Sequence, residues 1–389
     1  MPKLVFLATD VALALLLAGL ALYVWHARRS PDLRVTWAPV FRDGAAMSAL
    51  VLLSLFLVVA VLDSIHFRPL LPRAEGAAAD APAAYSTRTY SVLDQLLRGQ
   101  MEGTERTYSA PLSYRSYSKE TIEVDGRAVR EFPRLAHGGA HLTDPASEWL
   151  PDLARRSAAG LAGGLVAALL LAGAVTAARA ARRRVAFVDS ARAVWRRETE
   201  VPLRAIVMTA GALLLVAGWV AAVWPAYHVL GTDRTGNDVL YQALKSVRTA
   251  IVIGSLATLA TLPFAIAFGI LAGYFKGWVD DAIQYLYTVL SSIPGVLLIA
   301  AFVLMIQVWI DKNPQLYETG LERADVRLLL LCVILGVTGW ATLCRLLRAE
   351  TLKLSELDYV QAARAFGVSH FGIMRRHIFP NLMHIVLIV

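Results

Sequence analysis

The chain has 389 residues, of which 57% are hydrophobic and only 17% are charged. A soluble domain carries about 25% charged residues, and a disordered chain lacks apolar residues on this scale, so both classes are excluded. The net charge of +8 would suit a nucleic-acid-binding protein, but the excess of basic residues lies in short loops between apolar runs. Membrane proteins distribute their charge in this way, and we therefore predict no nucleic-acid partner.

Seven apolar runs are long enough to cross the hydrocarbon core of a bilayer, which takes about 20 helical residues. In chain order they are Leu4–Trp25, Ala45–Leu62, Ala158–Ala178, Ala205–Val223, Ile251–Phe275, Ile283–Ile310 and Leu328–Leu347. The sixth run contains Pro294 directly after a pair of serines, which predicts a kink or a break in that helix. The sequence thus predicts an all-α polytopic transmembrane bundle.

The basic residues of three loops predict the orientation of these spans. They follow the first, third and seventh runs and include Arg28, Arg29, Arg34, Arg42, Arg179, Arg182, Arg183, Arg184, Arg192, Arg196, Arg197, Arg345, Arg348, Lys353, Arg364, Arg375 and Arg376. If all three loops are cytoplasmic, the N-terminus and residues 65–156 are external. We predict that the first run is an uncleaved helix, because the arginine pair after it is typical of a stop-transfer flank.

The external residues 65–156 are polar and begin with an Ala/Pro-rich stretch, Glu75–Ala84. Within Glu120–Val129, alternating Thr, Ile and Val residues surround an Asp125–Gly126 turn signal, which predicts a β-hairpin. The two cysteines lie elsewhere, so no disulfide framework is expected here. We predict a small, partly β insert. It either docks a soluble partner or is a solvated loop domain.

Two pairs of glycines, Gly160 with Gly164 and Gly269 with Gly273, are spaced by one helical turn. Small residues at this spacing allow two helices to approach closely in lipid. These pairs predict helix packing and carry no further function.

A membrane enzyme would require ionisable groups inside the spans. Asp63 and Asp280 lie at predicted span ends, where we expect them to be solvated. His137 and His141 have the spacing of two metal ligands on one helix, but they lie in a Gly-rich loop and lack a third ligand. We therefore predict no catalytic residue and no metal site.

A loop after the seventh run has the pattern of a short helical hairpin. Ser355 and Asp358 have the spacing of a capping box, in which each side chain bonds the backbone of the other. A helix is expected over Tyr359–Phe366, and Gly367 would end it because glycine adopts the left-handed conformation at low cost.

Ser369 can cap a second helix that runs to about Phe379, and Pro380 is expected to mark the return toward the bilayer. The first helix carries small residues at Ala362 and Ala363, so it can lie in a groove on a partner without steric bulk. The pattern alone also fits an ordinary amphipathic loop, and it leaves both interpretations open.

This loop resembles the EAA motif of bacterial ABC importer permeases. The resemblance rests on Gln361, Ala362, Ala363, Gly367, His377 and Pro380, with Gln361 in place of the usual glutamate. In that family the loop is the coupling helix that sits in the ATPase subunit. The resemblance therefore implies an ATPase-coupling role for Ser355, Asp358, Tyr359, Gln361, Ala362, Ala363, Arg364, Phe366, Gly367, His377 and Pro380.

Two further blocks are similar to the oligopeptide, dipeptide and nickel branch of that family. They comprise Gly231, Thr232, Asp233, Gly236 and Asp238 in the first block, and Gly277, Trp278, Asp280 and Pro294 in the second. Members of the branch often carry Arg and Asp where this chain has Tyr285 and Thr288, so no salt bridge is transferred to those positions.

The resemblance covers about Val201–Val389 and implies a domain organisation. Residues 1–64 hold two extra N-terminal spans, residues 65–156 form the external insert, and residues 157–204 hold a span and a basic cytoplasmic linker. Residues 205–389 form the permease core. Because members continue with two further spans, we expect this core to be truncated.

The function implied by the resemblance is that of the permease subunit of an ATP-driven importer for di- or oligopeptides in the bacterial cytoplasmic (inner) membrane. The expected partners are a second permease subunit, two ABC ATPase subunits, an extracytoplasmic substrate-binding protein and membrane lipid. The chain has no Gly-rich phosphate loop of the Walker type, so ATP and magnesium would bind to the ATPase partner. The same machinery could instead move nickel or another small solute, or the chain could be a receptor or scaffold that transports nothing.

Overall fold

The computed structural model describes residues 2–71, 85–124, 127–317 and 319–388. Within these ranges, seven helical segments are long and apolar enough to cross a membrane. They are Ala8–Arg29, Gly44–Ser64, Pro145–Arg183, Leu203–Val223, Val239–Phe275, Gly295–Lys312 and Gly320–Ser355. The predicted polytopic all-α class with a small, partly β insert is confirmed.

Several helices begin or end where hydropathy alone does not place them. Residues Lys3–Val5 form strand β1, so the first helix, α1 (Ala8–Arg29), begins after Leu4. Helix α6 (Pro145–Arg183) and helix α9 (Val239–Phe275) extend well beyond their apolar runs into polar sequence. The predicted break at Pro294 is present, because α10 (Gly277–Ser292) ends just before it and α11 (Gly295–Lys312) starts just after it.

The chain divides into two compact units, of which the first comprises Met1–Val5 and Leu16–Thr249. This unit contains β1, α6, most of α1 and the start of α9. Its other elements are α2 (Pro31–Arg42), α3 (Gly44–Ser64), β2 (His66–Arg68), β3 (Tyr90–Ser91), α4 (Val92–Leu96), α5 (Arg98–Glu102), β4 (Glu120–Val124), β5 (Arg127–Glu131), α7 (Phe187–Trp195) and α8 (Leu203–Val223). Strands β1, β2 and β3 form one antiparallel sheet, in which Leu4 pairs with Phe67 and His66 pairs with Ser91.

The predicted hairpin is present as β4 and β5, which pair in antiparallel register with Glu120 opposite Glu131. Its turn, Asp125–Gly126, lies outside the described residues, as does the Ala/Pro-rich stretch Glu75–Ala84. The insert thus combines two small sheets with the short helices α4 and α5.

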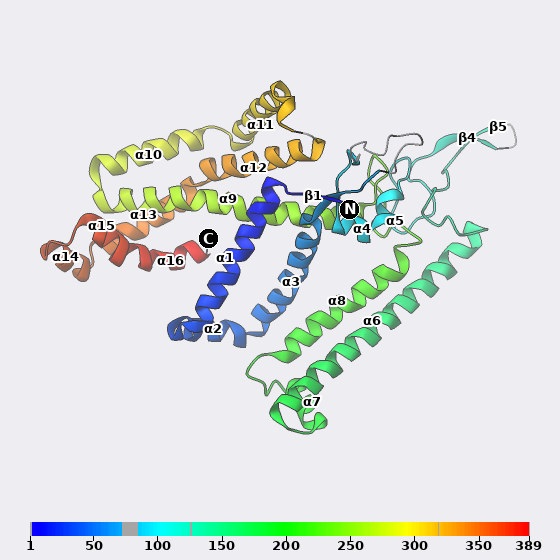
Figure 1. The fold of residues 1–389 in the computed structure, drawn as a ribbon, viewed down its shortest axis with the longest axis horizontal. Coiled ribbons are helices and arrows are strands. Elements are labelled where there is room, and N and C mark those ends of the chain that lie inside the picture. The colour runs from blue at the N-terminus through cyan, green and yellow to red at the C-terminus, as the bar shows by residue number, and fades with distance from the viewer. Residues whose placement is uncertain (1, 72–84, 125–126, 318, 389) are drawn as a thin grey trace, which may run out of the picture. The chain divides into compact units, whose positions relative to one another are not determined.

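Helices α6 and α8 lie side by side in the first unit (Figure 1). A Cβ atom placed on Gly160 would lie 2.6 Å from the carbonyl oxygen of Gly218, and one placed on Gly164 would lie 2.6 Å from that of Leu214. Real Cβ atoms do not come this close to backbone, so these positions require glycine. The predicted role of this glycine pair in helix packing is confirmed.

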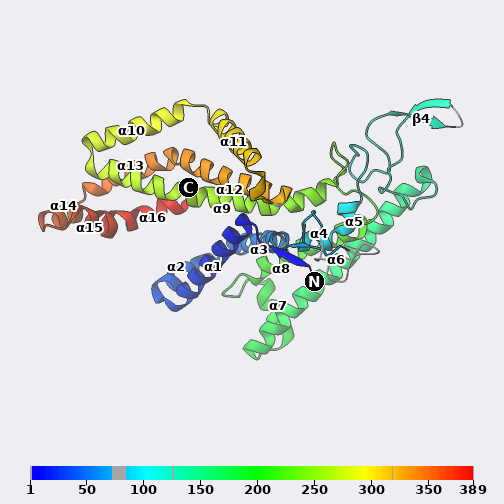
Figure 2. The same ribbon diagram turned by 45° about the horizontal axis from the view of Figure 1, so that its top comes forward.

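The second unit comprises Phe6–Leu15 and Ala250–Val389. Besides parts of α1 and α9, and helices α10 and α11, its elements are the 3-10 turn η1 (Pro314–Leu316), α12 (Gly320–Gly339), α13 (Ala341–Ser355), α14 (Asp358–Ala365), α15 (His370–Ile373), the π-helical turn η2 (Met374–Ile378) and α16 (Phe379–Ile388). Helices α12 and α13 lie alongside α9 in both views (Figures 1 and 2).

The second glycine pair brings α13 against α9. A Cβ atom on Gly269 would lie 2.7 Å from the Cβ of Leu347, and one on Gly273 would lie 2.5 Å from the Cβ of Thr351. Both contact residues are completely buried. This pair, too, serves the packing that the sequence predicts.

Asp63, at the end of α3, is not solvated as predicted. It is buried, accepts a hydrogen bond from the Ser91 hydroxyl at 2.8 Å and lies 3.5 Å from the Lys245 ammonium group. Lys245 also pairs with the buried Asp94 at 2.7 Å. The prediction failed because the polar first turns of α9 bring a cation to the end of α3, a pairing that no local pattern reveals.

Gly164 and Gly163 offer a matched test of the α6–α8 contact. We expect Gly164→Ala to lower the free energy of unfolding by about 1–3 kcal/mol, because the new methyl group would overpack against the backbone of α8. Gly163→Ala meets no atom within 4 Å and should be neutral or slightly stabilising, because alanine favours a helix. Denaturant unfolding of the detergent-solubilised protein measures both changes. Equal effects of the two substitutions would contradict the contact.

Candidate functional site

The predicted coupling residues gather in a compact helical loop at one end of the second unit (Figure 1). We call residues 355–381 the helical loop. It begins at the last residue of α13, contains α14, α15 and the π-helical turn η2, and ends in the first turn of α16, which packs against α13.

The predicted capping box at Ser355 is wrong. Ser355 is the last residue of α13, and its hydroxyl donates a hydrogen bond back to the carbonyl oxygen of Leu352 at 2.8 Å. Helix α14 begins at Asp358, and the residue before it, Leu357, makes no side-chain cap. The capping box fails because α13 continues to Ser355, which gives that residue a helical backbone instead of the extended one that a cap needs.

The turn between the two short helices agrees with the prediction. Gly367 has a φ of +77°, in the left-handed region that favours glycine. Ser369 then caps α15 by accepting a hydrogen bond from the backbone N–H of Gly372 at 3.2 Å. The second helix does not end at Phe379, because η2 leads directly into α16, and Pro380 lies near the start of α16.

An apolar core fixes the helical loop to the rest of the unit. Val360, Ile373 and Ile378 are fully buried and belong to one cluster with Leu347 and Leu354 of α13. Burial of a large aliphatic side chain contributes about 1.5–3 kcal/mol, so this cluster gives the loop a rigid base.

Polar contacts add to this base. The Tyr274 hydroxyl of α9 lies 2.9 Å from Nδ1 of His370, and the guanidinium group of Arg364 lies over the Tyr274 ring at 5.2 Å. Two further loop residues, Tyr359 and His377, have ring centroids 6.0 Å apart. The side-chain amide of Asn381 donates to the Tyr359 hydroxyl at 3.1 Å.

Gln361 stands where the resemblance expects glutamate, and its side-chain amide donates to the backbone carbonyl of Glu356 at 3.0 Å. Glu356 in turn forms an ion pair with Lys276, the residue before α10. The loop start is thus linked to the α9–α10 turn, where Gly277 has a φ of +53°.

The outer surface of the helical loop is apolar at its tip. Phe366 is 88% exposed and Phe371 is 70% exposed. Ala362 is exposed, whereas Ala363 is partly buried against the core and so does not belong to the tip as predicted. Large exposed aromatic side chains on a rigid base are typical of a protein–protein contact.

Asp280 is not solvated as predicted either. It is buried and forms a bidentate ion pair with Arg348 of α13, with 2.5 Å between Asp280 Oδ2 and Arg348 Nη2. Trp278, in the same motif, is 80% exposed. No local pattern predicts this pair, because its members are 68 residues apart.

The other predicted family motif lies in the first unit and ties the insert to the start of α9. Gly231 and Gly236 both have positive φ values, and a Cβ atom on Gly236 would lie 1.8 Å from the carbonyl oxygen of Glu105. Thr232 donates a hydrogen bond to the carbonyl oxygen of Thr107 at 2.8 Å. These residues therefore shape a loop that fits closely against residues 105–109.

Asp233 holds the turn of that motif. Its carboxylate accepts hydrogen bonds from the backbone N–H groups of Thr235 and Asn237, at 2.8 and 2.9 Å, and from the Gln242 side chain at 2.7 Å. Burial opposes ionisation, but these hydrogen bonds outweigh it and lower the pKa of Asp233 to about 2. This aspartate is a structural turn residue.

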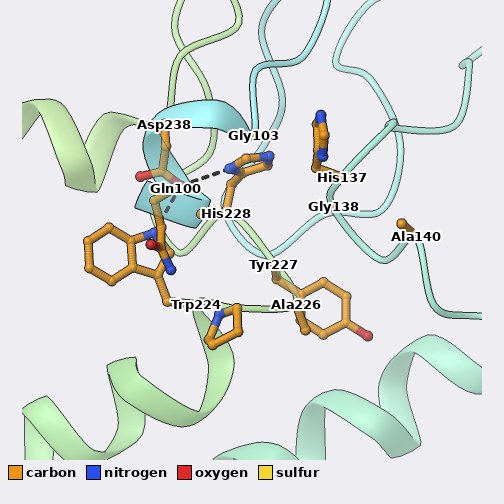
Figure 3. A pocket seen from close by; sticks show the side chains of 12 residues that line it. Gln100, Gly103, His137, Gly138, Ala140, Trp224, Ala226, Tyr227, His228 and Asp238 are labelled. Carbon is orange, nitrogen blue, oxygen red and sulfur yellow. Dashed lines mark hydrogen bonds and ion pairs between the residues drawn. The ribbon is translucent and has the colours of Figure 1, made fainter. Parts of the chain in front are cut away.

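Asp238 ends the motif and forms a buried cluster with His228 and Glu105. Nδ1 of His228 lies 2.7 Å from Asp238 (Figure 3), and Nε2 lies 3.3 Å from Glu105. Burial favours the neutral imidazole, but hydrogen bonds to the two carboxylates raise the pKa of His228 to about 9. Burial also opposes the charge on Glu105, yet His228 and three backbone N–H donors lower the pKa of Glu105 to about 2. No local motif predicts this cluster, because His228 and Glu105 are 123 residues apart.

Beside the cluster lies a cavity of about 250 Å³ that Trp224, Tyr227, His228, His137 and Gln100 help to line (Figure 3). His141 does not line this cavity; its Nε2 atom lies 2.8 Å from Oδ2 of Asp152. No group of three or more His, Cys, Asp or Glu side chains in the described ranges could hold a metal ion.

The buried cluster predicts a pH-dependent stability. The pKa of His228 is raised by folding, so its stabilising contribution is complete below about pH 6.5 and is lost as the pH rises toward 9. We expect the free energy of unfolding to fall by on the order of 2 kcal/mol between pH 6.5 and 9. Unfolding of the wild type and of His228→Gln across this pH range measures the difference between their free energies of unfolding, which should vanish at high pH.

The control is His137→Gln, whose side chain lines the same cavity and which should keep the wild-type dependence of stability on pH. The same dependence in His228→Gln would contradict the assignment.

Comparison with known proteins supports the resemblance. Residues 265–388 match the model of the binding-protein-dependent transport system inner membrane component family. The chain is 29% identical over 161 residues to the oligopeptide transport system permease protein OppC of Mycobacterium bovis, covering 41% of this chain and 50% of that protein. It is 30% identical over 154 residues to the glutathione transport system permease protein GsiD of Pectobacterium atrosepticum, covering 40% and 45%.

A further relative is the inner membrane ABC transporter permease protein YejE of Escherichia coli, which is 34% identical over 154 residues, or 40% of each chain. The chain thus spans half or less of the length of these relatives. They are named as transport permeases and not as enzymes. Residues 265–388 are therefore similar to the binding-protein-dependent transport system inner membrane components, and the chain is a multi-pass protein of the cytoplasmic membrane.

Proposed function

We propose that this chain is a permease subunit of an ATP-driven ABC importer that moves di- or oligopeptides across the cytoplasmic membrane. The observation that carries the proposal is the helical loop, with its exposed Phe366 on a base of buried side chains. The names of the relatives favour peptides, since two of them are permeases for oligopeptides and for glutathione.

In this proposal the helical loop is the lever that a separate ATPase moves. A second permease subunit would complete the pore, two ATPase subunits would bind ATP and magnesium, and an extracytoplasmic binding protein would deliver the substrate. Closure of the ATPase pair would displace the loop. A difference of about 5.5 kcal/mol in affinity for the two states suffices to move a population from 1:99 to 99:1.

The packing of the helical loop suits this transmission. Force on α14 reaches α13 through the buried cluster around Val360 and reaches α9 through Tyr274. The π-helical turn Met374–Ile378 lies between α15 and α16. Such turns occur often at functional sites. Here the turn would let α15 rotate or shift relative to α16.

The same machinery could serve nickel or another small solute, and a receptor or scaffold without transport is the remaining alternative. The chain would bind no cofactor or metal in any of these cases. Neighbouring genes for an ATPase and a secreted binding protein would favour the importer over the scaffold.

The exposed phenylalanine gives the test of coupling. We expect Phe366→Ala to weaken binding of the ATPase about 30-fold or more, because an aromatic anchor at the centre of an interface contributes about 2 kcal/mol or more. Phe366→Leu, which keeps an apolar side chain, should retain part of the affinity. Co-purification and titration of the ATPase with the complete importer measure the change.

The control is Phe6→Ala, which removes a side chain that is 79% exposed outside the helical loop. It should leave ATPase binding unchanged. If Phe366→Ala binds the ATPase and supports uptake as wild type does, the coupling assignment is wrong.

The substrate is tested by uptake in cells that carry the complete importer. We expect labelled di- and oligopeptides to accumulate in an ATP-dependent manner, and Ni²⁺ not to accumulate. Uptake of Ni²⁺ without peptide uptake would replace the peptide proposal with the nickel alternative. No uptake of any solute, despite a bound ATPase, would favour the scaffold.

A further inference from the structure

A cavity of about 620 Å³ lies between the first turns of α3 and α8. Its lining combines three arginines with small hydroxyl residues: Arg42, Arg197, Arg204, Ser48, Thr199 and Thr209. Arg42 ends α2, Arg204 lies in the first turn of α8, and Arg197 lies in the basic linker before α8. The charge pattern predicts that these segments are on the cytoplasmic side of the membrane. All of the lining lies in the first unit, far along the chain from the helical loop.

The two helices begin at the same level beside this cavity. A Cβ atom on Gly44, the first residue of α3, would lie 3.6 Å from the Cβ of Ala205 in the first turn of α8. The Thr209 hydroxyl donates to the Ser48 hydroxyl at 2.9 Å. The two helix N-termini therefore lie beside the same space. The Asp43 carboxylate caps α3 and offsets the partial positive charge there, so only the charge at the start of α8 remains. The start of α8 has no side-chain cap.

The positive charge of the lining is not neutralised within the described part of the chain. Glu200 pairs with Arg183 at 3.0 Å, and the Asp43 carboxylate accepts a hydrogen bond from the Ala46 N–H at 2.7 Å. Neither acid forms an ion pair with a lining arginine in the ranges described.

Arg204 adds a second, independent observation. Its Nε atom is buried and has no hydrogen-bond partner among the described residues. Its Nη1 atom donates to the Trp195 carbonyl oxygen at 3.3 Å, and its guanidinium group lies over the Trp195 ring at 5.8 Å. The side chain is thus held in place with its buried Nε–H donor unused, an arrangement that an oxyanion would complete.

An apolar groove of about 600 Å³ runs along α2 and the start of α3. Trp37, Phe41, Met47, Leu50 and Phe56 contribute to its almost wholly apolar lining. Phe41 directly precedes Arg42, and Met47 directly precedes Ser48, so the two surfaces share the same turns. Helix α2 has no buried residue. A short amphipathic helix of this kind lies in the membrane interface.

We propose that the cavity binds the phosphate group of an anionic phospholipid in the inner leaflet, with an acyl chain along the apolar groove. Basic pockets between helices on the cytoplasmic side of a membrane recognise such headgroups. A free phosphate would use the arginines and the N-terminus of α8 but not the groove. A bound lipid would bridge α3 and α8 at their cytoplasmic ends, and this role does not depend on the transported solute.

The test uses the full chain, delipidated in detergent and titrated with phosphatidylglycerol, phosphatidylethanolamine or glycerol 3-phosphate, with bound molecules counted by native mass spectrometry. The variant is Arg42→Gln with Arg197→Gln, because both side chains are exposed and their loss leaves the packing intact. We expect phosphatidylglycerol to bind about 30-fold more weakly, since each arginine near the headgroup contributes roughly fivefold. Arg204→Gln should weaken binding as well.

The matched control is Arg182→Gln with Arg196→Gln, which removes two exposed charges from the same basic region outside the cavity. It should bind phosphatidylglycerol as wild type does. Equal loss in the control, unchanged binding in Arg42→Gln with Arg197→Gln, or equal affinity for phosphatidylethanolamine would overturn the proposal. If glycerol 3-phosphate binds as tightly as phosphatidylglycerol, the ligand is a soluble anion and the lipid assignment is wrong.

Discussion

Close backbone contact at glycine is the interaction on which both units of this protein depend. In lipid, the hydrophobic effect does not drive one apolar helix against another, so association rests on close packing and hydrogen bonds. Gly160, Gly164 and Gly218 bring α6 and α8 together in the first unit, and Gly269 and Gly273 bring α13 to α9 in the second. A side chain at any of these positions would collide with its neighbour.

The second of these contacts has a direct bearing on the helical loop. Helix α13 leads into the loop, and α9 supplies Tyr274, which contacts His370 and Arg364 within it. The Asp280–Arg348 ion pair holds α10 to the same stretch of α13. The glycine contact, the Tyr274 contacts and the Asp280–Arg348 ion pair thus all hold α13 and the helical loop to α9 and α10. These contacts fix the helical loop to α9, α10 and α13, and a rigid attachment is the property that the proposed lever requires.

The seven spans could be predicted from the sequence because a bilayer demands long apolar helices with internally satisfied backbone groups. Their ends could not, because α6 and α9 continue into polar sequence whose side chains find distant partners. Lys245 meets Asp63 and Asp94 in this way.

The candidate site shows the same division. Gly367 and Ser369 act through backbone geometry within a few residues, so their roles were predictable. The capping box predicted at Ser355 is wrong because α13 extends to this residue and gives it a helical backbone. The His228–Glu105 and Asp280–Arg348 pairs join residues far apart in the chain, and no periodicity or local motif records such pairs.

Gln361 has a consequence for the chemistry of the helical loop. Its amide donates a hydrogen bond to the Glu356 carbonyl, and an ionised glutamate at the same position has no proton to donate. An amide does not titrate in the physiological range. The hydrogen bond from Gln361 to Glu356 is therefore independent of pH in that range, and acidity cannot act as a signal through this side chain.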